Sequence, residues 1–224
     1  MPSVSGAPAQ CYSPHQDGKK GQRFKYQLGL GAGSFNSTLR FNDENKSEVG
    51  IQMNSISISG GMPLTQRWMI HVVFGMILNG ELKPKSGPDH DVKPGGFASI
   101  GLDYSTVTGN GYKPYIDLSI LLGASMVKTE NSDTKSKADY VSTDLRLGAL
   151  GSWNVNNVLF PFAAVRVFGG PVLWQIEGKG VTGSDIHHYQ FAIGSALHVG
   201  PTVAYIEWAE IGEKSLNAGF SIIW

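Results

Sequence analysis

The sequence has a single cysteine, little charge and no long apolar run. Cys11, the only cysteine among 224 residues, cannot build a disulfide framework or a cysteine-based zinc site. Charged residues make up 16% of the chain, and 18 basic side chains balance 18 acidic ones. A neutral chain without a basic stripe is not expected to bind nucleic acid. No apolar run approaches the roughly 18 residues of a spanning helix, which excludes a helical membrane protein.

Apolar residues recur instead at every second position along most of the chain after residue 22. The clearest stretch runs from Trp68 to Leu78, where six alternate residues are apolar. A repeat of two is typical of amphipathic strands and not of helices. The pattern predicts ten antiparallel strands. Their expected bounds are 23–41, 47–60, 65–82, 95–107, 112–128, 138–153, 157–176, 186–199, 201–210 and 214–224.

Two strands contain details that lead to specific predictions. In 47–60, Ile56 and Ile58 break the phase of the preceding apolar residues Val49, Ile51 and Met53. A β-bulge in this strand is the expected explanation. In 65–82, continuation of the alternation places Glu81 on the polar face.

The connections between the strands alternate in kind. Tight turns rich in Gly, Pro and Asn follow every second strand, whereas the intervening connections, such as 83–95, 129–137 and 177–184, are mostly longer and more polar. This alternation predicts an up-and-down transmembrane β-barrel of about ten strands. With an even strand count, both termini lie at the short-turn end, on the periplasmic side.

The apolar faces are predicted to contact lipid, although a soluble barrel with an apolar interior has the same alternation. The polar faces carry charges of both signs and many glycines, which suits a crowded lumen better than a solvated exterior. Six alternate apolar positions over 11 residues cover the ~25 Å apolar band of an outer membrane. Aromatic residues near the strand ends match the two interfacial girdles. These are Phe24, Tyr26, Trp68, Tyr104, Trp153, Tyr189, Trp208 and Trp224.

The last nine residues carry a family resemblance. In Leu216–Trp224, alternate apolar residues end in an aromatic C-terminal residue. Over residues 23–224 the chain resembles small bacterial outer-membrane β-barrels of the OmpA-like or opacity-like kind. The resemblance implies an outer-membrane location, contact with its lipid and lipopolysaccharide, and recognition of Phe220, Ile222 and Trp224 by the barrel-insertion machinery.

Residues 1–22 do not fit the barrel pattern. They are rich in Ser, Pro, Gly and Ala, and we expect a disordered periplasmic tail or a signal remnant. Ala7-Pro8-Ala9 has the form of a signal-peptidase site but lacks a preceding apolar segment. The residues before Cys11 are a poor lipidation sequence, so a bystander thiol is expected.

The predicted inward faces carry a charge network of Asp103, Asp117, Asp144, Arg146 and Arg166. If these side chains meet, they pair, because an unpaired charge there is costly. The network is then either a structural plug or the selectivity constriction of a narrow porin. In ten strands the interior is wide enough for little besides side chains, so we favour the plug.

An enzyme is the remaining alternative. Omptin proteases, which are also ten-stranded, use paired aspartates in one long loop and an Asp/His pair in another. Asp89 and Asp91, with Asp185 and His187, have this form, in which two carboxylates hold a water and an Asp orients a His base. The residues around them do not resemble omptins. His90, His187 and His188 could meet as an adventitious metal site, but no metal or cofactor is predicted.

The preferred hypothesis is a non-enzymatic barrel that anchors, or forms part of, a cell-envelope complex. A flat wall of small residues at Pro161, Ala163 and Gly169 is a candidate surface for another envelope protein. A narrow porin is the first alternative, and an omptin-like peptidase the second.

Overall fold

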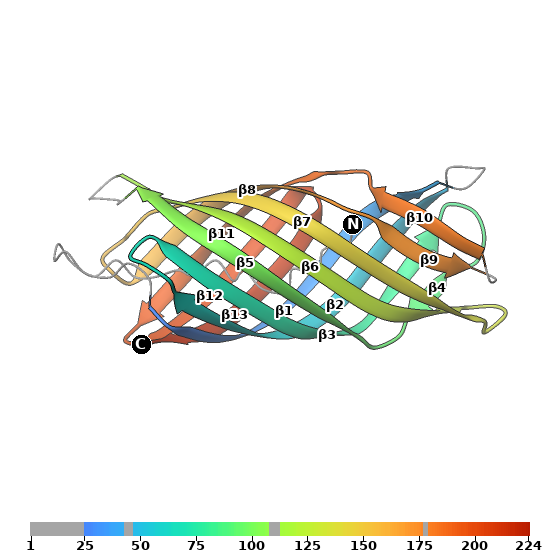
Figure 1. Ribbon diagram of the computed structural model, residues 1–224, viewed down its shortest axis with the longest axis horizontal. Helices are drawn as coiled ribbons and strands as arrows, with labels where there is room; N and C mark the ends of the chain where they lie inside the picture. Colours follow the sequence, from blue (N-terminus) through green and yellow to red (C-terminus); the bar gives the residue numbers. More distant parts are fainter. Residues whose placement is uncertain (1–24, 43–46, 108–112, 177–178) are drawn as a thin grey trace.

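The strands of the chain form one closed antiparallel barrel. The computed structural model describes residues 25–42, 47–107, 113–176 and 179–224. The strands in these residues are β1 (Gln27–Phe41), β2 (Glu48–Pro63), β3 (Trp68–Pro84), β4 (His90–Val92), β5 (Gly95–Val107), β6 (Tyr115–Asn131), β7 (Lys137–Ser152), β8 (Leu159–Gly169), β9 (Val172–Ile176), β10 (Lys179–Asp185), β11 (Tyr189–Val199), β12 (Thr202–Gly212) and β13 (Lys214–Ile223). Figure 1 shows them tilted around one long axis. Among the described residues, no helix is long and apolar enough to cross a membrane.

The predicted fold class is confirmed, and each predicted segment overlaps one long strand. The long strands β1, β2, β3, β5, β6, β7, β8, β11, β12 and β13 pair in this order, and β13 pairs with β1 to close the ring. Gln27 of β1 lies opposite Ile223 of β13 at the end that carries the short turns, here called the turn end. The opposite end, which carries β4, β9 and β10, is called the loop end (Figure 1).

The three short strands were not predicted, and they change the barrel at the loop end. The predicted strand 157–176 divides into β8 and β9 at Pro171, which has no N–H to donate to a ladder. β10 occupies most of the connection expected at 177–184. In the described residues at the loop end, the pairing order is β1, β2, β3, β4, β6, β7, β9, β10 and back to β1. The ten-stranded ring therefore becomes an eight-stranded ring.

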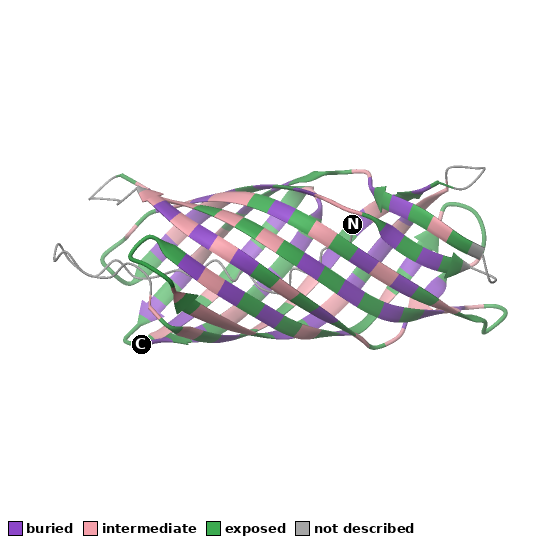
Figure 2. Ribbon diagram, viewed as in Figure 1, coloured by how far each residue is buried: buried purple, intermediate pink, exposed green. Residues whose placement is uncertain are grey.

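The polarity of the wall reverses between the two rings. In the ten-stranded ring the outward side chains are apolar, as predicted: Phe74 and Leu122 are each 57% exposed. In the loop-end ring most outward side chains are polar or charged, including Arg40, Gln52, Lys83, Lys128 and Lys137, and Leu173 is an apolar exception. Figure 2 shows buried and exposed residues alternating along both parts. The loop-end ring thus extends from the apolar belt as a wall suited to water.

This reversal corrects the prediction for β2, where no bulge is found. Val49, Ile51 and Met53 point inward at the loop end, whereas Ile56 and Ile58 point outward in the apolar belt. Alternation is continuous, and only the side that carries the apolar residues changes. The irregularity lies in the partner strand β3, since Asn54 pairs with Asn79 and Ser55 with Ile77.

The extra residue in β3 is Leu78, and it reverses the phase of everything after it. Leu82 is therefore fully buried inside the barrel. Glu81, expected on the polar inner face, points outward and pairs with Lys83 at 2.5 Å. The prediction for Glu81 was wrong because one bulged residue moves all later side chains to the other face.

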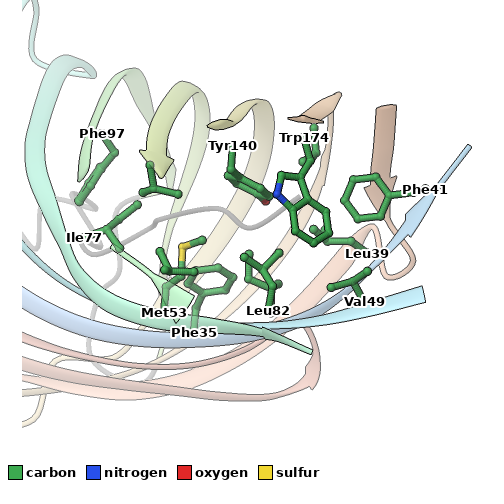
Figure 3. Close-up of a cluster of buried hydrophobic side chains, with 14 of the residues drawn as sticks. Phe35, Leu39, Phe41, Val49, Met53, Ile77, Leu82, Phe97, Tyr140 and Trp174 are labelled. Carbon is green, nitrogen blue, oxygen red and sulfur yellow. The ribbon is translucent and has the colours of Figure 1, made fainter. Parts of the chain in front are cut away.

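An apolar cluster occupies the inside of the loop-end ring. Its aromatic members include Trp174 of β9, Tyr140 of β7, and Phe35 and Phe41 of β1, and Figure 3 shows these side chains within one cluster. The remaining buried members are Leu39, Val49, Ile51, Met53, Val73, Ile77, Leu82, Val92, Phe97, Val127 and Val172. Trp174 Nε1 donates to Thr129 Oγ1 at 3.0 Å, so the indole keeps a hydrogen bond inside this cluster.

Candidate functional site

A belt of charged side chains lies on the inner wall of the ten-stranded ring. This charged belt also includes uncharged polar residues. It consists of His71 of β3, Asp103 of β5, Asp117 of β6, Asp144 and Arg146 of β7, Arg166 of β8, Gln190 of β11, Glu207 of β12, and Glu213, Ser215 and Asn217 at β13. On its turn-end side lies a second buried apolar cluster, which runs from Leu150 and Phe160 to Val203 and Ile223. Successive side chains of a strand point to opposite faces, and this alternation places the residues of the belt on the inner face.

Arg166 and Glu207 form the tightest pair in the belt. Arg166 donates to both Glu207 oxygens, at 3.0 and 2.5 Å, and to Gln190 Oε1 at 2.7 Å. Asn217 Nδ2 adds a bond to Glu207 Oε1 at 3.3 Å. Both charged side chains are buried. A bidentate guanidinium–carboxylate pair of this kind holds both partners in one geometry.

Arg146 is held by Glu213 at the tip of the β12–β13 hairpin. Its Nη2 donates to Glu213 Oε1 at 3.1 Å, and its guanidinium carbon lies 4.5 Å from the Phe168 ring centroid. Asp144 is a more distant neighbour, 3.8 Å from Arg146 Nε. Gln190 Nε2 donates to Glu213 Oε1 at 3.2 Å. The two arginines are thus connected through Gln190 and Glu213.

His71 and Asp103 form a separate pair on the opposite part of the inner wall. His71 Nδ1 and Asp103 Oδ2 are 2.8 Å apart, and both side chains are buried. A Cβ at Gly101 would lie 2.2 Å from His71 Nε2, so the imidazole packs here only because the adjacent strand carries glycine. Asp117 lies on the inner face of β6, opposite Leu150 and nearer the turn end.

The five predicted network residues all lie on the inner wall, and Arg146 lies near Asp144. The closer carboxylate partners are Glu207 and Glu213. Glu213 escaped the sequence analysis because it lies in a tight turn after Gly212, where a charged residue is usually solvated. Extending the alternation of Ser215 and Asn217 by one position would have placed it inward.

The four candidate catalytic residues are not brought together. Asp91 lies on β4, directly opposite Glu81 and Glu130 of the neighbouring strands, and 3.5 Å from Lys93 on the outer wall. Asp185 of β10 is buried and accepts a bond from Ser37 Oγ at 2.5 Å. Asp185 also accepts the backbone N–H of His187, whose side chain is exposed.

The Asp91 and Asp185 carboxylates thus point to different sides of the wall, from strands on opposite sides of the loop-end ring. Asp89 directly precedes β4. In the part of the chain that the structure describes, no three His, Cys, Asp or Glu side chains are grouped to hold a metal ion, His90, His187 and His188 included.

The C-terminal residues present their apolar side chains on the outer wall. Phe220, Ile222 and Trp224 point outward from β13, and Trp224 stacks on Tyr26 at a centroid distance of 6.4 Å. Trp68 and Tyr104 form a second aromatic pair near the turn end, at 4.6 Å. On β8, Pro161 and Ala163 are on the outer face and half-buried. Residues 1–22, including Cys11, lie outside the described residues.

Solved structures with the same architecture come from the bacterial outer membrane. The outer-membrane protease OmpT from Escherichia coli aligns with a TM-score of 0.52 at 11% identity, over 89% of this chain and 95% of that one. The chain has the fold of a bacterial outer-membrane β-barrel. The translocator domain of the autotransporter NalP from Neisseria meningitidis aligns at 0.50 and 12% identity, over 94% and 91% of the two chains. The predicted outer-membrane location agrees with this fold and with the apolar belt of the barrel.

Sequence comparison does not place the barrel in a family. No protein-family model matches the chain. No curated protein matches it either. Because the aligned structures share so little sequence, they establish the fold and not an activity.

We expect His90 to make the loop-end ring less stable in acid. Its ring is buried and packs edge-on against Trp174 at 4.9 Å, and burial lowers the pKa of His90, although Asp89 opposes this shift. The unfolded imidazole retains a pKa of about 6.5 and takes up a proton first. The folded loop-end ring therefore has its full stability above about pH 6.5. It loses stability as the pH falls through that value toward the lower pKa of folded His90.

Hydrogen exchange of β4 measures this effect. We expect faster exchange at pH 5 than at pH 7.5 after correction for the intrinsic rate. In a His90→Phe variant, which keeps an aromatic ring against Trp174, the corrected exchange should not depend on pH. An equal pH dependence in the variant would assign the effect to another group.

Proposed function

We propose that this protein is a closed outer-membrane barrel that anchors, or forms part of, a cell-envelope complex. The observation that carries the proposal is the apolar cluster in the loop-end ring. Trp174, Tyr140 and Leu82 are at most 1% exposed there. An ion on this route would have to leave water for a packed apolar interior, which costs tens of kcal/mol for an unpaired charge.

The charged belt gives the interior a second closed layer in this proposal. Arg166 with Glu207, and Arg146 with Glu213, pair across the inner wall and hold β7, β8, β12 and β13 together. The belt is then structural, as the sequence analysis favoured. The barrel would contact outer-membrane lipid through its apolar belt and be recognised by the insertion machinery through Phe220, Ile222 and Trp224.

The second candidate is a narrow pore, and one observation favours it. Among the described inward side chains of the belt there are five carboxylates and two guanidinium groups. These are Asp103, Asp117, Asp144, Glu207 and Glu213 with Arg146 and Arg166. An inner wall with excess negative charge selects cations. A pore along this route would therefore prefer cations.

Single-channel recording in a planar bilayer separates the two candidates. We expect the refolded wild-type barrel to give no conductance steps, because the apolar cluster closes the loop end. The Arg146→Ala/Arg166→Ala variant should also be silent, since it leaves that cluster in place. Steady cation-preferring steps in the wild type, with a size altered by the two substitutions, would establish the pore instead.

The peptidase alternative has less support in this geometry. Its four residues lie on β10, on β4 and beside these strands, and the Asp91 and Asp185 carboxylates point to different sides of the wall. Asp185 already bonds Ser37 and the His187 backbone. Cleavage of varied peptides by the purified barrel, lost in His187→Ala, would restore this alternative.

A further inference from the structure

A groove of about 440 Å³ lies on the outer wall at the start of the loop-end ring. Its polar lining consists of Gln52 and Asn54 of β2, Asn79 and Glu81 of β3, Asp91 of β4, and Lys93 between β4 and β5. Leu78 and Pro94 supply apolar surface. The groove takes no part in closing the barrel interior, because it lies on the outer wall.

The groove results from the change in strand number. β5 pairs with β3 as far as Ile77, and β4 takes its place from Gly80. The bulged residue Leu78 lies in the gap between these two pairings, and residues 93–94 connect β4 to β5 beside it. The hollow is thus formed by backbone pairing and not by the rotamer of one exposed side chain.

The lining suits a ligand rich in hydroxyl groups. Three carboxamides supply both donors and acceptors, and Asn54 Nδ2 donates to Asn79 Oδ1 at 2.7 Å, which fixes two of them together. The two carboxylates each have a lysine beside them: Glu81 pairs with Lys83, and Asp91 lies 3.5 Å from Lys93, which is also 3.4 Å from Glu130. The groove therefore has a small excess of negative charge. An isolated phosphate would face two carboxylates, whereas sugar hydroxyls can bond to all these groups.

The height of the groove on the wall points to the same chemistry. On β3, Phe74, Met76 and Leu78 are outward and apolar, and Asn79 and Glu81 are the next outward residues. The groove therefore lies at the upper edge of the apolar belt. In a membrane this is the level at which acyl chains give way to headgroups.

We propose that this groove binds a saccharide, supplied either as the headgroup of a glycolipid in the outer leaflet or as a free sugar. Carboxamides and carboxylates bond its hydroxyls, and Leu78 and Pro94 pack against the apolar face of a sugar ring. The proposal deepens the interaction role proposed above and rests on it. Conductance does not depend on the groove, so the closed barrel is tested separately.

Nuclear magnetic resonance of the refolded full-length barrel tests the proposal. The probes are the side-chain amide signals of Gln52, Asn54 and Asn79. One arm adds an unphosphorylated glucosamine disaccharide to the barrel in detergent micelles. The other compares nanodiscs of phospholipid alone with nanodiscs that contain lipopolysaccharide. We expect saturable shifts of these three signals with the disaccharide, or shifts only with lipopolysaccharide, which would identify the headgroup as the source.

Two matched variants decide whether the groove is responsible. Gln52→Leu should weaken binding about tenfold, which corresponds to roughly 1.4 kcal/mol of lost hydrogen bonding. Gln175→Leu, at an exposed position on β9 of the same ring, should leave binding unchanged. If Gln52→Leu does not fold, Asn79→Ser serves in its place. Absence of shifts in both arms, or an equal loss in the Gln175→Leu control, would overturn the proposal.

Discussion

Replacing Glu207 by alanine should lower the free energy of unfolding by about 3–5 kcal/mol, the usual result of removing one partner from a buried ion pair. Arg166 would keep its bond to Gln190 but lose both bonds to Glu207. The remaining guanidinium charge would then be buried without its bidentate carboxylate partner. Urea unfolding of the barrel in phospholipid vesicles, followed by tryptophan fluorescence, measures the loss.

A matched control lies on the same strand. Glu210 forms an exposed pair with Lys214 on the outer wall, so Glu210→Ala should cost at most about 1 kcal/mol. The double variant Arg166→Met/Glu207→Met removes both charges and should recover most of the stability lost in Glu207→Ala. If Glu207→Ala costs no more than Glu210→Ala, the belt is solvated. That outcome would favour the narrow pore over the closed barrel.

The general architecture could be predicted because the strand repeat is short and the apolar belt is long. From Trp68 to Leu78, one face of β3 is apolar without interruption, and the structure exposes that face. The same alternation places Asp103, Asp144, Arg146 and Arg166 inside. Side-chain direction in a strand depends only on position parity, so these predictions needed no tertiary information.

The loop-end ring could not be predicted for the same reason. Leu78 adds one residue to β3, and after a bulge parity assigns the wrong face, as happened for Glu81. In β2 the alternation is intact, and parity places Ile51 and Ile56 on opposite sides of the wall. Both are apolar because the environment outside the barrel changes from water to lipid between them. Parity alone does not say which face is apolar. The pairing of Arg166 with Glu207 also depends on which strands neighbour one another, which a single sequence does not specify.

The second large effect should be confined to the loop-end ring. Trp174→Ala removes an indole that packs on Phe41 at 5.5 Å and on His90 at 4.9 Å, and it leaves Thr129 without the indole donor. Truncation of a buried tryptophan costs about 3–5 kcal/mol. The strands around it are short: β9 has five residues and β4 has three. The free energy lost with the indole is therefore large relative to the free energy of the few backbone pairs that hold these strands in place.

Hydrogen exchange should show which strands lose stability in the Trp174→Ala variant. Exchange should accelerate in β4, β9 and β10, whereas β12 and β13 should keep their protection because the Arg166–Glu207 pair is untouched. Leu173→Ala, at the adjacent outward position that is 53% exposed, is the matched control and should have little effect. Equal acceleration in all strands would mean that the two rings unfold as one unit. Acceleration limited to the loop end would instead show that the loop-end ring unfolds independently of the ten-stranded ring in the membrane.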